Sequence, residues 1–385
     1  MSVIFSERTN WEHTTNDISQ VISGFRKDNI NYLDLSVSNP TQCGFSYPQG
    51  FLADFDNENN LTYSAQSFGL KYARMAVVEY YHAKGVIIDV NQVILTSSTS
   101  EAYSYLFRLL LNSYDTVLFP KPSYPLFEYL VDVNDLIMAQ YELVYNNQWF
   151  VDKDSLETTV NDKTKALVVV NPNNPTGSFM QSDDISLINR VAQDSNLSII
   201  SDEVFSDYTL DSKRYSTFVG NKNVLTFVLG GLSKTLAMPQ MKLSWIIVSG
   251  PDRQVEEALN RLEIIADTYL SVNTPVQNAL ASWLKQKDVI QVPIKQRVEK
   301  NYQWLKSLNS KAFGVLNVDG GWYVILKVML GEGDFVYDLL CKEHVYVHPG
   351  YFYDLDGDAL CVVSLLTEEN VLKEGIARLI KFIDG

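Results

Sequence analysis

The chain has 385 residues, more than a single hydrophobic core usually organises, so we expect two domains, or a large domain with a smaller lobe. Hydrophobic residues make up 46% of the chain and charged residues 20%, as in an ordinary globular protein, while the formal net charge is −15. An acidic chain lacks the positive surface that binds nucleic acids and anionic membranes, so neither is expected as a partner.

No motif indicates a metal site, a disulfide framework or a membrane span. Cys43, Cys341 and Cys361 are far apart, and the four histidines lack the spacing of metal ligands. No apolar run reaches the ~20 residues of a membrane helix. The segment from Met1 to Arg8 lacks the basic and apolar stretches of a signal peptide, so we expect a cytoplasmic protein.

Short apolar runs alternate with amphipathic stretches through the middle of the chain. Strands are predicted at Val93–Leu95, Thr116–Phe119, Ala166–Val170, Leu197–Ile200, Val224–Leu229 and Ser244–Val248. Helices predicted between them include Ser100–Leu111 and Ser182–Ser195. Because the strands are apolar without polar alternation, they suit a sheet that helices cover on both faces, which makes the fold class α/β.

The C-terminal part has a different order of elements. We predict helices at Asp252–Asp267 and Val292–Leu308, a strand at Trp322–Val328, a helix at Asp334–Glu343, a strand at Leu360–Leu365 and a helix at Glu368–Ile383. Thr367 is the expected N-cap of the last helix, with Glu368 and Glu369 favourable at its positive end. This pattern suits a smaller α+β lobe.

Three polar motifs follow strand-like runs. Asn174 lies in Asn-Pro-Asn-Asn-Pro-Thr-Gly (171–177), Asp202 in Ser-Asp-Glu-Val-Phe (201–205) and Lys234 in Gly-Gly-Leu-Ser-Lys-Thr (230–235). An amide, a carboxylate and a lysine in such places are the groups needed to hold a pyridine aldehyde. With these motifs the chain resembles the class I/II aminotransferases, which are pyridoxal-phosphate enzymes of fold type I, from about Leu33 to Phe382.

The resemblance implies a complete architecture. Residues 46–275 would form a large cofactor-binding domain with a mostly parallel mixed sheet covered by helices, and residues 276–385 a small α+β domain. Residues 1–45 would pack with the small domain. Pyridoxal 5'-phosphate is the implied cofactor, amino and keto acids are the implied small-molecule partners, and a homodimer with shared active sites is the implied assembly.

The resemblance also assigns the central roles. Lys234 is expected to hold the cofactor as an imine and then to move the Cα proton of the substrate. Asp202 is expected to keep the pyridine nitrogen protonated, so that the ring acts as an electron sink, and Asn174 to donate to the phenolic oxygen of the ring. Taken alone, each residue has an ordinary explanation, as a surface lysine, a capping aspartate and a turn asparagine; their combination favours the site.

A phosphate site is expected where a strand-like run meets a helix. Ser98, Thr99 and Ser100 occupy this turn, where backbone N–H groups and hydroxyls can hold an anion. A simple helix cap explains the same residues equally well. The resemblance adds Ser233, and also Lys242, which stands where the family generally has an arginine and keeps the charge without the bidentate fork.

Two tyrosines match aromatic residues of the family. Tyr124, in Lys-Pro-Ser-Tyr-Pro, matches the one that stacks on the pyridine ring, although a core tyrosine is the alternative. Tyr63 matches a tyrosine that reaches the phosphate of the neighbouring subunit, so the active site would need a dimer. For the nearby Arg74 we prefer a structural role on a helix.

The chain also departs from the family. Phe205 replaces a tyrosine that usually gives a second hydrogen bond to the phenolic oxygen, and Val362 stands at the place of the arginine that grips the substrate α-carboxylate. Lys327 is a candidate replacement cation, although a strand-end lysine extending to water is the simpler interpretation. Ser38 and Asn39 match the family's substrate-side loop, which plain turn chemistry also explains.

The function that these matches favour is pyridoxal-phosphate-dependent transamination between an amino acid and a 2-oxo acid. A β- or γ-eliminating lyase on the same scaffold shares every motif and remains open. A non-catalytic cofactor-binding protein is the third possibility, and the presence of both Lys234 and Asp202 argues against it.

Overall fold

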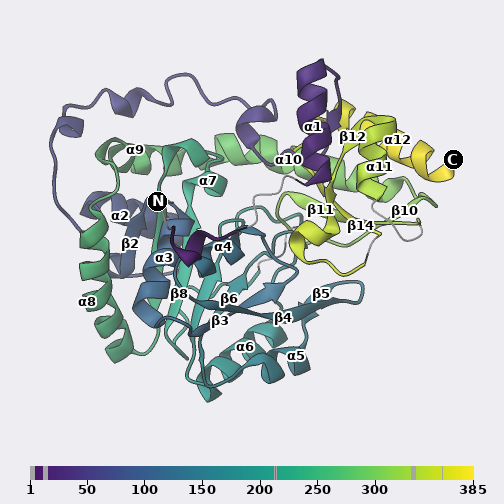
Figure 1. The fold of residues 1–385 in the computed structure, drawn as a ribbon. Helices are drawn as coiled ribbons and strands as arrows, with labels where there is room; N and C mark the ends of the chain where they lie inside the picture. The colour runs from purple at the N-terminus through teal and green to yellow at the C-terminus, as the bar shows by residue number, and fades with distance from the viewer. Residues whose placement is uncertain (1–4, 12–15, 212, 214, 331–334, 358) are drawn as a thin grey trace, which may run out of the picture.

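Two β-sheets organise the protein. The computed structural model describes residues 5–11, 16–211, 213, 215–330, 335–357 and 359–385. In this part of the chain an eight-stranded sheet, flanked by helices, forms the larger body, and a four-stranded sheet with its own helices forms a smaller lobe beside it (Figure 1). The predicted α/β class with a smaller α+β lobe is therefore confirmed.

The large sheet contains all six strands predicted from apolar runs. Its order is β2 (Val93–Thr96), β9 (Ser244–Ser249), β8 (Thr226–Gly231), β7 (Ser198–Asp202), β6 (Thr164–Val170), β3 (Thr116–Lys121), β4 (Ile137–Tyr145) and β5 (Trp149–Val151). The hairpin of β4 and β5 was not predicted, because exposed and half-buried residues interrupt the apolar pattern of β4 at the sheet edge.

Most pairs in this sheet are parallel. Strands β4, β3, β6, β7 and β8 pair in parallel, and β9 is antiparallel to both β8 and β2. It follows that β2 runs in the same direction as β8. The carboxyl ends of β2, β3, β6, β7 and β8 therefore lie at one edge of the sheet, where ligand sites of such folds form.

Apolar side chains are buried on both faces of the sheet. In β6, Leu167 and Val169 belong to one core cluster, while Ala166, Val168 and Val170 belong to another. The helices over the first face are α2 (Lys71–Ala83), α5 (Lys153–Thr159), α6 (Ser182–Asp194) and α9 (Thr274–Lys285). Those over the second face are α3 (Thr99–Leu110), α4 (Leu126–Asp132) and α8 (Asp252–Tyr269). Continuous apolar runs form these strands because neither face meets water.

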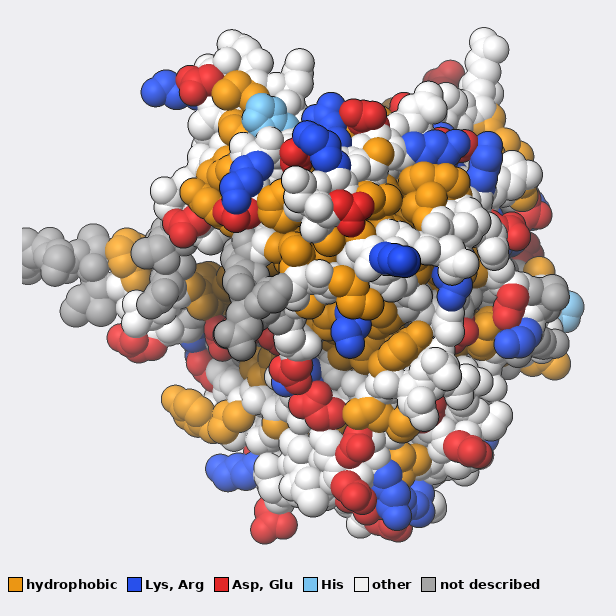
Figure 2. Space-filling view, turned by 90° about the vertical axis from the view of Figure 1, so that its right-hand side faces the viewer, with side chains coloured by type: hydrophobic (Ala, Val, Ile, Leu, Met, Phe, Trp, Pro, Cys, Tyr) orange, Lys and Arg blue, Asp and Glu red, His pale blue; other side chains and the backbone are white. Residues whose placement is uncertain are grey.

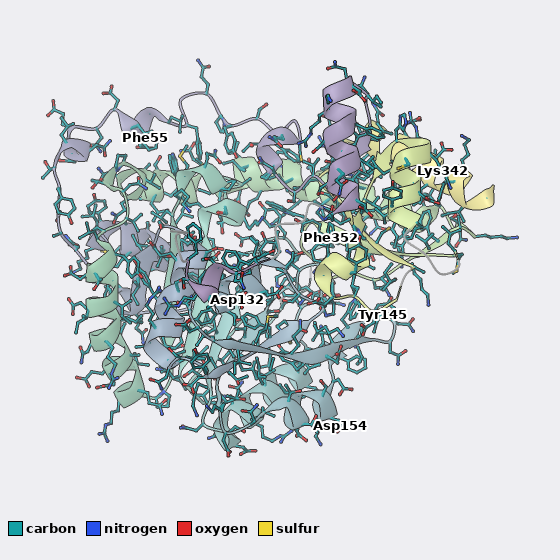
Figure 3. All side chains as sticks on the ribbon, in the orientation of Figure 1. Phe55, Asp132, Tyr145, Asp154, Lys342 and Phe352 are labelled. Atoms are coloured by element: carbon teal, nitrogen blue, oxygen red, sulfur yellow. The ribbon has the colours of Figure 1, made fainter. Side chains whose placement is uncertain are left out.

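The smaller lobe is built on an antiparallel sheet. Its order is β10 (Phe313–Val315), β11 (Tyr323–Val328), β14 (Leu360–Ser364) and β13 (His348–Pro349). The helices of this part are α10 (Lys287–Ser307), α11 (Phe335–Glu343) and α12 (Glu369–Asp384). Figure 3 shows Lys342 and Phe352 on this lobe and Asp132 and Asp154 on the larger body.

The N-terminal segment joins the smaller lobe. Strand β1 (Leu33–Asp34) pairs in parallel with β12 (Val345–Tyr346), and α1 (Asp17–Asp28) packs on α11. This pairing supports the division into residues 1–45, 46–275 and 276–385, which we retain as a proposal. Short elements complete the chain: α7 (Leu232–Thr235) and 3-10 turns at Glu7–Thr9, Pro40–Gln42, Ala53–Phe55, Glu58–Leu61, Val90–Gln92, Pro239–Met241 and Gly350–Tyr353.

The predicted N-cap of the last helix and the predicted start of α10 were wrong. Helix α12 is preceded by Glu368 at its N-cap, without a side-chain capping bond, while the buried Thr367 hydroxyl has no partner in the described residues. The Thr367 carbonyl instead accepts a hydrogen bond from Asn301, which fixes it to α10. Helix α10 begins at Lys287 and continues through Pro293, whereas the predicted helix began at Val292.

The surface is acidic and mixed. On the face in Figure 2, lysine and arginine side chains are scattered among acidic ones, and apolar side chains gather in the middle of the face. This distribution fits the net charge of −15. Among the described residues, none of the helices combines the length and the apolar character that a membrane crossing requires.

Candidate active site

The ends of three neighbouring strands bring the main motifs together. Asp202 is the last residue of β7, in register with Val170 at the end of β6 and with Leu229 in β8, which leads directly to Lys234. The N–H of Asn171 donates to the Asp202 carbonyl at 2.8 Å, so the Asn174 turn begins beside it. A Cβ on Gly231 would lie 2.3 Å from Ser244 Oγ, so only glycine allows β8 to pass this close to β9.

Lys234 is half-buried and its amine lies in an aromatic environment. Its Nζ is 4.9 Å from the ring centre of Phe205 and 4.8 Å from that of Trp322. Burial lowers the pKa of this amine to about 8, although the charge of Asp202 opposes the shift. At neutral pH about a tenth of such an amine is uncharged, compared with roughly one in three thousand for an ordinary lysine. The amine is therefore prepared for nucleophilic attack on an aldehyde.

Asp202 is a buried carboxylate without a cation in contact. It is 8% exposed, and burial raises its pKa to about 6. Hydrogen bonds from the Val204 N–H and from the Tyr103 hydroxyl, both 3.2 Å long, and the charge of Lys234 oppose this shift. No ion pair of Asp202 occurs in the described part of the chain. Such a carboxylate suits a cationic ligand, for example a protonated ring nitrogen.

Of the three asparagines in the 171–177 motif, Asn174 is the one whose side-chain oxygen makes no hydrogen bond within the turn. The side chain of Asn171 bonds to Met180 N and Ser216 O, and that of Asn173 bonds to Thr176 and Pro122. The buried Oδ1 of Asn174 has no hydrogen-bond partner among the described residues. This buried oxygen lies in the turn that begins beside Asp202, and it fits a ligand group that can donate a hydrogen bond.

Aromatic residues enclose these polar groups. The Phe205 ring is 3% exposed and stands edge-on to Trp322, with 5.1 Å between ring centres. Tyr124 is 40% exposed, and its pKa is raised by burial and by the charge of Asp202, which places it near that carboxylate. Sequence reasoning missed Trp322 and Tyr103 as site residues, because each comes from an element distant in the chain and neither belongs to a motif.

The predicted phosphate turn lies at the same sheet edge. Helix α3 starts at Thr99 directly after β2, and the Ser98 hydroxyl caps it by accepting from Glu101 N at 3.1 Å. The simple capping role is thus real for Ser98, while Thr99 and Ser100 occupy the first turn. Of the other two candidates, Ser233 is half-buried, and Lys242 is exposed in the left-handed conformation, with φ 51°.

The predicted substrate residues lie on different elements. A hydrogen bond from Ser38 reaches Tyr323, whose ring centre is 6.4 Å from that of Phe205. The Asn39 oxygen accepts from Thr41 N, so it serves the turn. Lys327 is exposed and lies four residues beyond Tyr323 on β11, about 13 Å along the strand. Its assignment stays a prediction from the sequence.

The remaining candidates are placed as follows. Val362 is buried in β14, in register with Ile325, and carries no charge into the site. Tyr63 is 66% exposed, so its ring is available to another molecule. Arg74 donates to the carbonyls of Gly69 and Val90, which is the structural role preferred from the sequence.

Comparison with known proteins identifies the family. The model of the family "Aminotransferase class I and II" matches residues 48–379. The glutamate-pyruvate aminotransferase AlaA of Haemophilus influenzae is 28% identical over 401 residues, covering 99% of this chain and 98% of that protein. The tyrosine aminotransferase of Mus musculus is 25% identical over 96% of this chain and 86% of that protein.

Solved structures share the fold over the whole length. The alanine aminotransferase of Pyrococcus furiosus superposes with a TM-score of 0.90 at 26% identity, covering 99% of this chain and 100% of that one. A double mutant of Thermus thermophilus aspartate aminotransferase gives a TM-score of 0.85 at 19% identity, covering 99% and 100%, and shows the shared fold alone. Since the family model spans most of the chain, the protein belongs to the class I and II aminotransferases, enzymes that use pyridoxal 5'-phosphate to transfer amino groups between amino acids and 2-oxo acids.

Proposed function

We propose that Lys234 is the catalytic residue of this transamination, holding the cofactor and then moving the proton at the substrate Cα. The observation that carries the proposal is the position of its amine between Phe205 and Trp322, with a pKa lowered to about 8. When bound, pyridoxal 5'-phosphate supplies the electron sink for the substrate carbanion. The amine can take a proton near neutral pH because burial keeps part of it uncharged.

Asp202 holds the charge on the ring nitrogen. Its carboxylate is poorly stabilised alone, since burial raises its pKa to about 6. A cation beside it would lower that pKa and keep both groups charged. The Nδ2 group of Asn174 donates to the phenolic oxygen, and Phe205, which has no hydroxyl, leaves that oxygen without a second donor from position 205. Tyr124 covers the ring face.

The phosphate is held by the first turn of α3 together with cations and hydroxyls nearby. Ser98 shapes the turn as its N-cap, and Thr99 and Ser100 offer N–H groups and hydroxyls. Ser233 and Lys242, both on the segment after β8, complete the set as a hydroxyl and a positive charge. These assignments rest on the resemblance and on the shared sheet edge.

The active form is a homodimer with shared sites. The segment around residues 46–66 arches away from the body in Figure 1, and Figure 3 shows Phe55 on it. Large apolar side chains are exposed along this segment and next to it: Leu52, Phe55, Leu61, Tyr63, Tyr72, Met75, Tyr269 and Leu270. Such a surface suits a second copy of the chain, with Tyr63 reaching the partner's phosphate.

The dimer has a direct test. Lys234→Ala and Tyr63→Ala are each expected to be defective, but a refolded mixture should recover activity, because one site of each mixed dimer contains both native residues. A mixture no more active than its components would contradict the sharing of sites. Light scattering of the wild-type protein should give twice the mass of the chain.

The substrate side differs from the family pattern. Val362 is buried and uncharged, so the α-carboxylate needs another partner; Ser38, Asn39 and Lys327 are the proposed contacts. Glutamate and pyruvate are the first donor and acceptor to assay, because the Haemophilus influenzae relative is named for them. We further propose a cytoplasmic location, which the three free cysteines support and which fractionation would test.

The deciding experiment is a screen of amino donors and keto acceptors. Absorbance follows the cofactor, and product amino acid is measured together with ammonia and pyruvate release. Transamination predicts a new amino acid without ammonia, and loss of turnover in Asp202→Ala with little change in folding. Ammonia release without a keto acceptor would instead establish the eliminating lyase. Wild-type rates in Asp202→Ala would refute the role of that carboxylate.

A further inference from the structure

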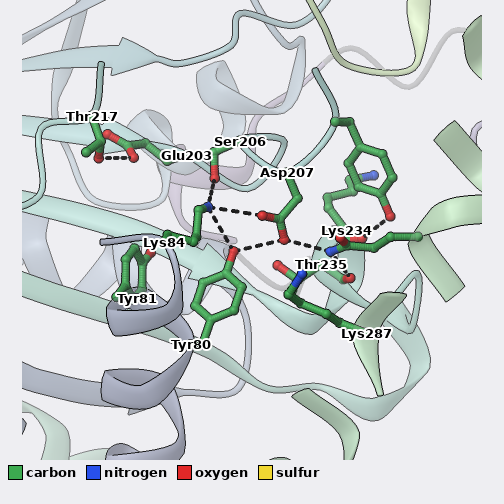
Figure 4. Close-up of polar contacts among 12 residues, drawn as sticks. Tyr80, Tyr81, Lys84, Glu203, Ser206, Asp207, Thr217, Lys234, Thr235 and Lys287 are labelled. Carbon is green, nitrogen blue, oxygen red and sulfur yellow. Dashed lines mark hydrogen bonds and ion pairs between the residues drawn. The ribbon is translucent and has the colours of Figure 1, made fainter. Parts of the chain in front are cut away.

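A partly buried ion pair lies next to the backbone of Lys234 and Thr235, with the Asp207 side chain 8% exposed and the Lys84 side chain 30% exposed. Lys84 Nζ, at the end of α2, is 3.0 Å from Asp207 Oδ1 in the turn that follows β7. Lys84 also donates to Ser206 Oγ and Tyr80 Oη, each at 3.2 Å. Figure 4 shows Lys84, Tyr80 and Asp207 joined in a closed set of contacts next to Thr235 and Lys234.

Both oxygens of Asp207 are occupied. Oδ2 accepts from the Tyr80 hydroxyl at 2.9 Å and from Gln291 Nε2 at 2.6 Å. Burial alone would raise the pKa of this carboxyl, but Lys84 and the bonds from Gln291 and Tyr80 bring it below its ordinary value. The pair is therefore charged at neutral pH, although it touches none of the groups assigned to the chemistry.

Two hydrogen bonds hold the backbone at the catalytic lysine and at the residue after it, and one of them comes from a partner of Asp207. Gln291 Nε2 donates to the Thr235 carbonyl at 2.8 Å as well as to Asp207. The Tyr208 hydroxyl, from the residue after Asp207, donates to the Lys234 carbonyl at 2.8 Å. The orientation of the Gln291 amide follows from these partners, because reversing it would set its oxygen against two acceptors.

The turn that contains Asp207 also carries the carboxylate and part of the aromatic wall of the site. Asp207 closes the segment that begins at Asp202 and contains Phe205, so its position affects the carboxylate and the aromatic wall as well as the lysine. Helix α10, which carries Gln291, comes from the C-terminal part of the chain. The network thus joins three elements at the point where the amine of Lys234 must meet Asp202 and Phe205.

Stability alone is a poor explanation for this arrangement. An ion pair that is largely removed from water loses hydration on its charges, here mostly on the 8% exposed Asp207, and apolar side chains of similar size commonly serve stability as well or better. Precise positioning of the catalytic amine is a better explanation, because a displacement of about 1 Å in a reacting group can lower a rate about a hundredfold. We propose that Lys84, Asp207 and Gln291 form a positioning network that fixes the backbone just after Lys234, at the Thr235 carbonyl, and so orients the catalytic amine. This inference rests on the proposed role of Lys234.

The test compares two buried amides on the same helix. Gln291→Met keeps the length of the side chain and removes both donations. Asn301→Leu is the control: Asn301 is also on α10, is 2% exposed and donates to the carbonyls of Leu365 and Thr367, remote from Lys234 in the chain. Both variants lose two buried hydrogen bonds, so both should lower the melting temperature of the cofactor-free protein.

Only Gln291→Met should change the chemistry. We expect kcat to fall about ten- to a hundredfold with little change in KM, and the pKa of the lysine–cofactor linkage, read from absorbance, to shift. The pH at which Lys234 becomes reactive to an acylating reagent in the cofactor-free protein should shift as well. Asn301→Leu should leave kcat, the linkage pKa and the pH of Lys234 acylation at their wild-type values. Equal effects in both variants, or none in Gln291→Met, would overturn the proposal.

A milder variant covers the case in which Gln291→Met does not fold. Tyr208→Phe removes one oxygen from a ring that stays packed on Trp322, and it releases the Lys234 carbonyl. Like Gln291→Met, it should lower kcat and shift the linkage pKa. Unchanged values of both in a folded Tyr208→Phe would also refute the network. Failure of the proposed function is separate, because it would appear in the wild-type protein as the absence of a cofactor adduct at Lys234.

Discussion

Phe205→Tyr should strengthen the hold on the cofactor's phenolic oxygen. The Phe205 ring lies 4.9 Å from Lys234 Nζ and is 3% exposed, so an added hydroxyl would stand in a dry site close to the reacting amine. A hydrogen bond to a charged oxygen is worth about 1.5–3 kcal/mol. Because one pKa unit is about 1.4 kcal/mol, the pKa of the lysine–cofactor linkage should fall by about one to two units.

The assay is an absorbance titration of the cofactor-loaded protein. The hydroxyl stabilises the negative oxygen and so weakens the binding of the proton at the linkage, which is why the pKa falls. Phe313→Tyr is the matched control, since Phe313 is also 3% exposed but lies in β10 of the small sheet. Overpacking can cost each variant about 1–3 kcal/mol of stability, so melting temperatures are measured alongside. An unchanged titration in a folded Phe205→Tyr would refute this account of position 205.

Three other predictions concern charged groups. Burial raises the pKa of Asp202 to about 6 in the folded cofactor-free protein, so its contribution to stability is present below ~pH 4 and lost as the pH rises through 6. Asp202→Asn should therefore gain stability relative to wild type as the pH rises from 5 to 8, by about 1.4 kcal/mol; an unchanged difference would contradict the buried-carboxylate argument. In the cofactor-free protein, acylation of Lys234 should reach half its maximal rate near pH 8, and a midpoint at the pKa of ordinary lysines would refute its burial. If Lys327 pairs with the substrate carboxylate, Lys327→Met should lower kcat/KM by about a decade or more and leave cofactor binding unchanged. If kcat/KM stays intact for every accepted amino acid, Lys327 is structural, and amines without a carboxylate are the next substrates to assay.

The sequence predicted the strands that are buried on both faces and missed those that are not. Residues 166–170 are apolar throughout because helices cover both sides of β6, and this pattern can be read without a structure. Strand β4 has exposed and half-buried positions at the sheet edge, so its residues resemble a loop. The cap of α12 was misplaced because Thr367 is held by Asn301, a contact 66 residues away that no local rule shows.

The site divides in a similar way. Asn174, Asp202 and Lys234 follow strands whose carboxyl ends are neighbours, so their meeting could be predicted from order alone. Trp322 reaches the lysine from the C-terminal part of the chain. The contact between Lys84 and Asp207 spans 123 residues. Packing between distant elements creates both contacts, so neither could be predicted from the spacing of residues along the chain.

The central claim is that Lys234 holds the cofactor, and chemical trapping tests it most directly. The protein is loaded with pyridoxal 5'-phosphate, reduced with borohydride and digested, and the labelled peptide is identified by mass spectrometry. The account predicts one stable adduct, on Lys234, which is absent from Lys234→Ala. An adduct on another lysine, or a wild-type protein that binds the cofactor without any adduct, would contradict it.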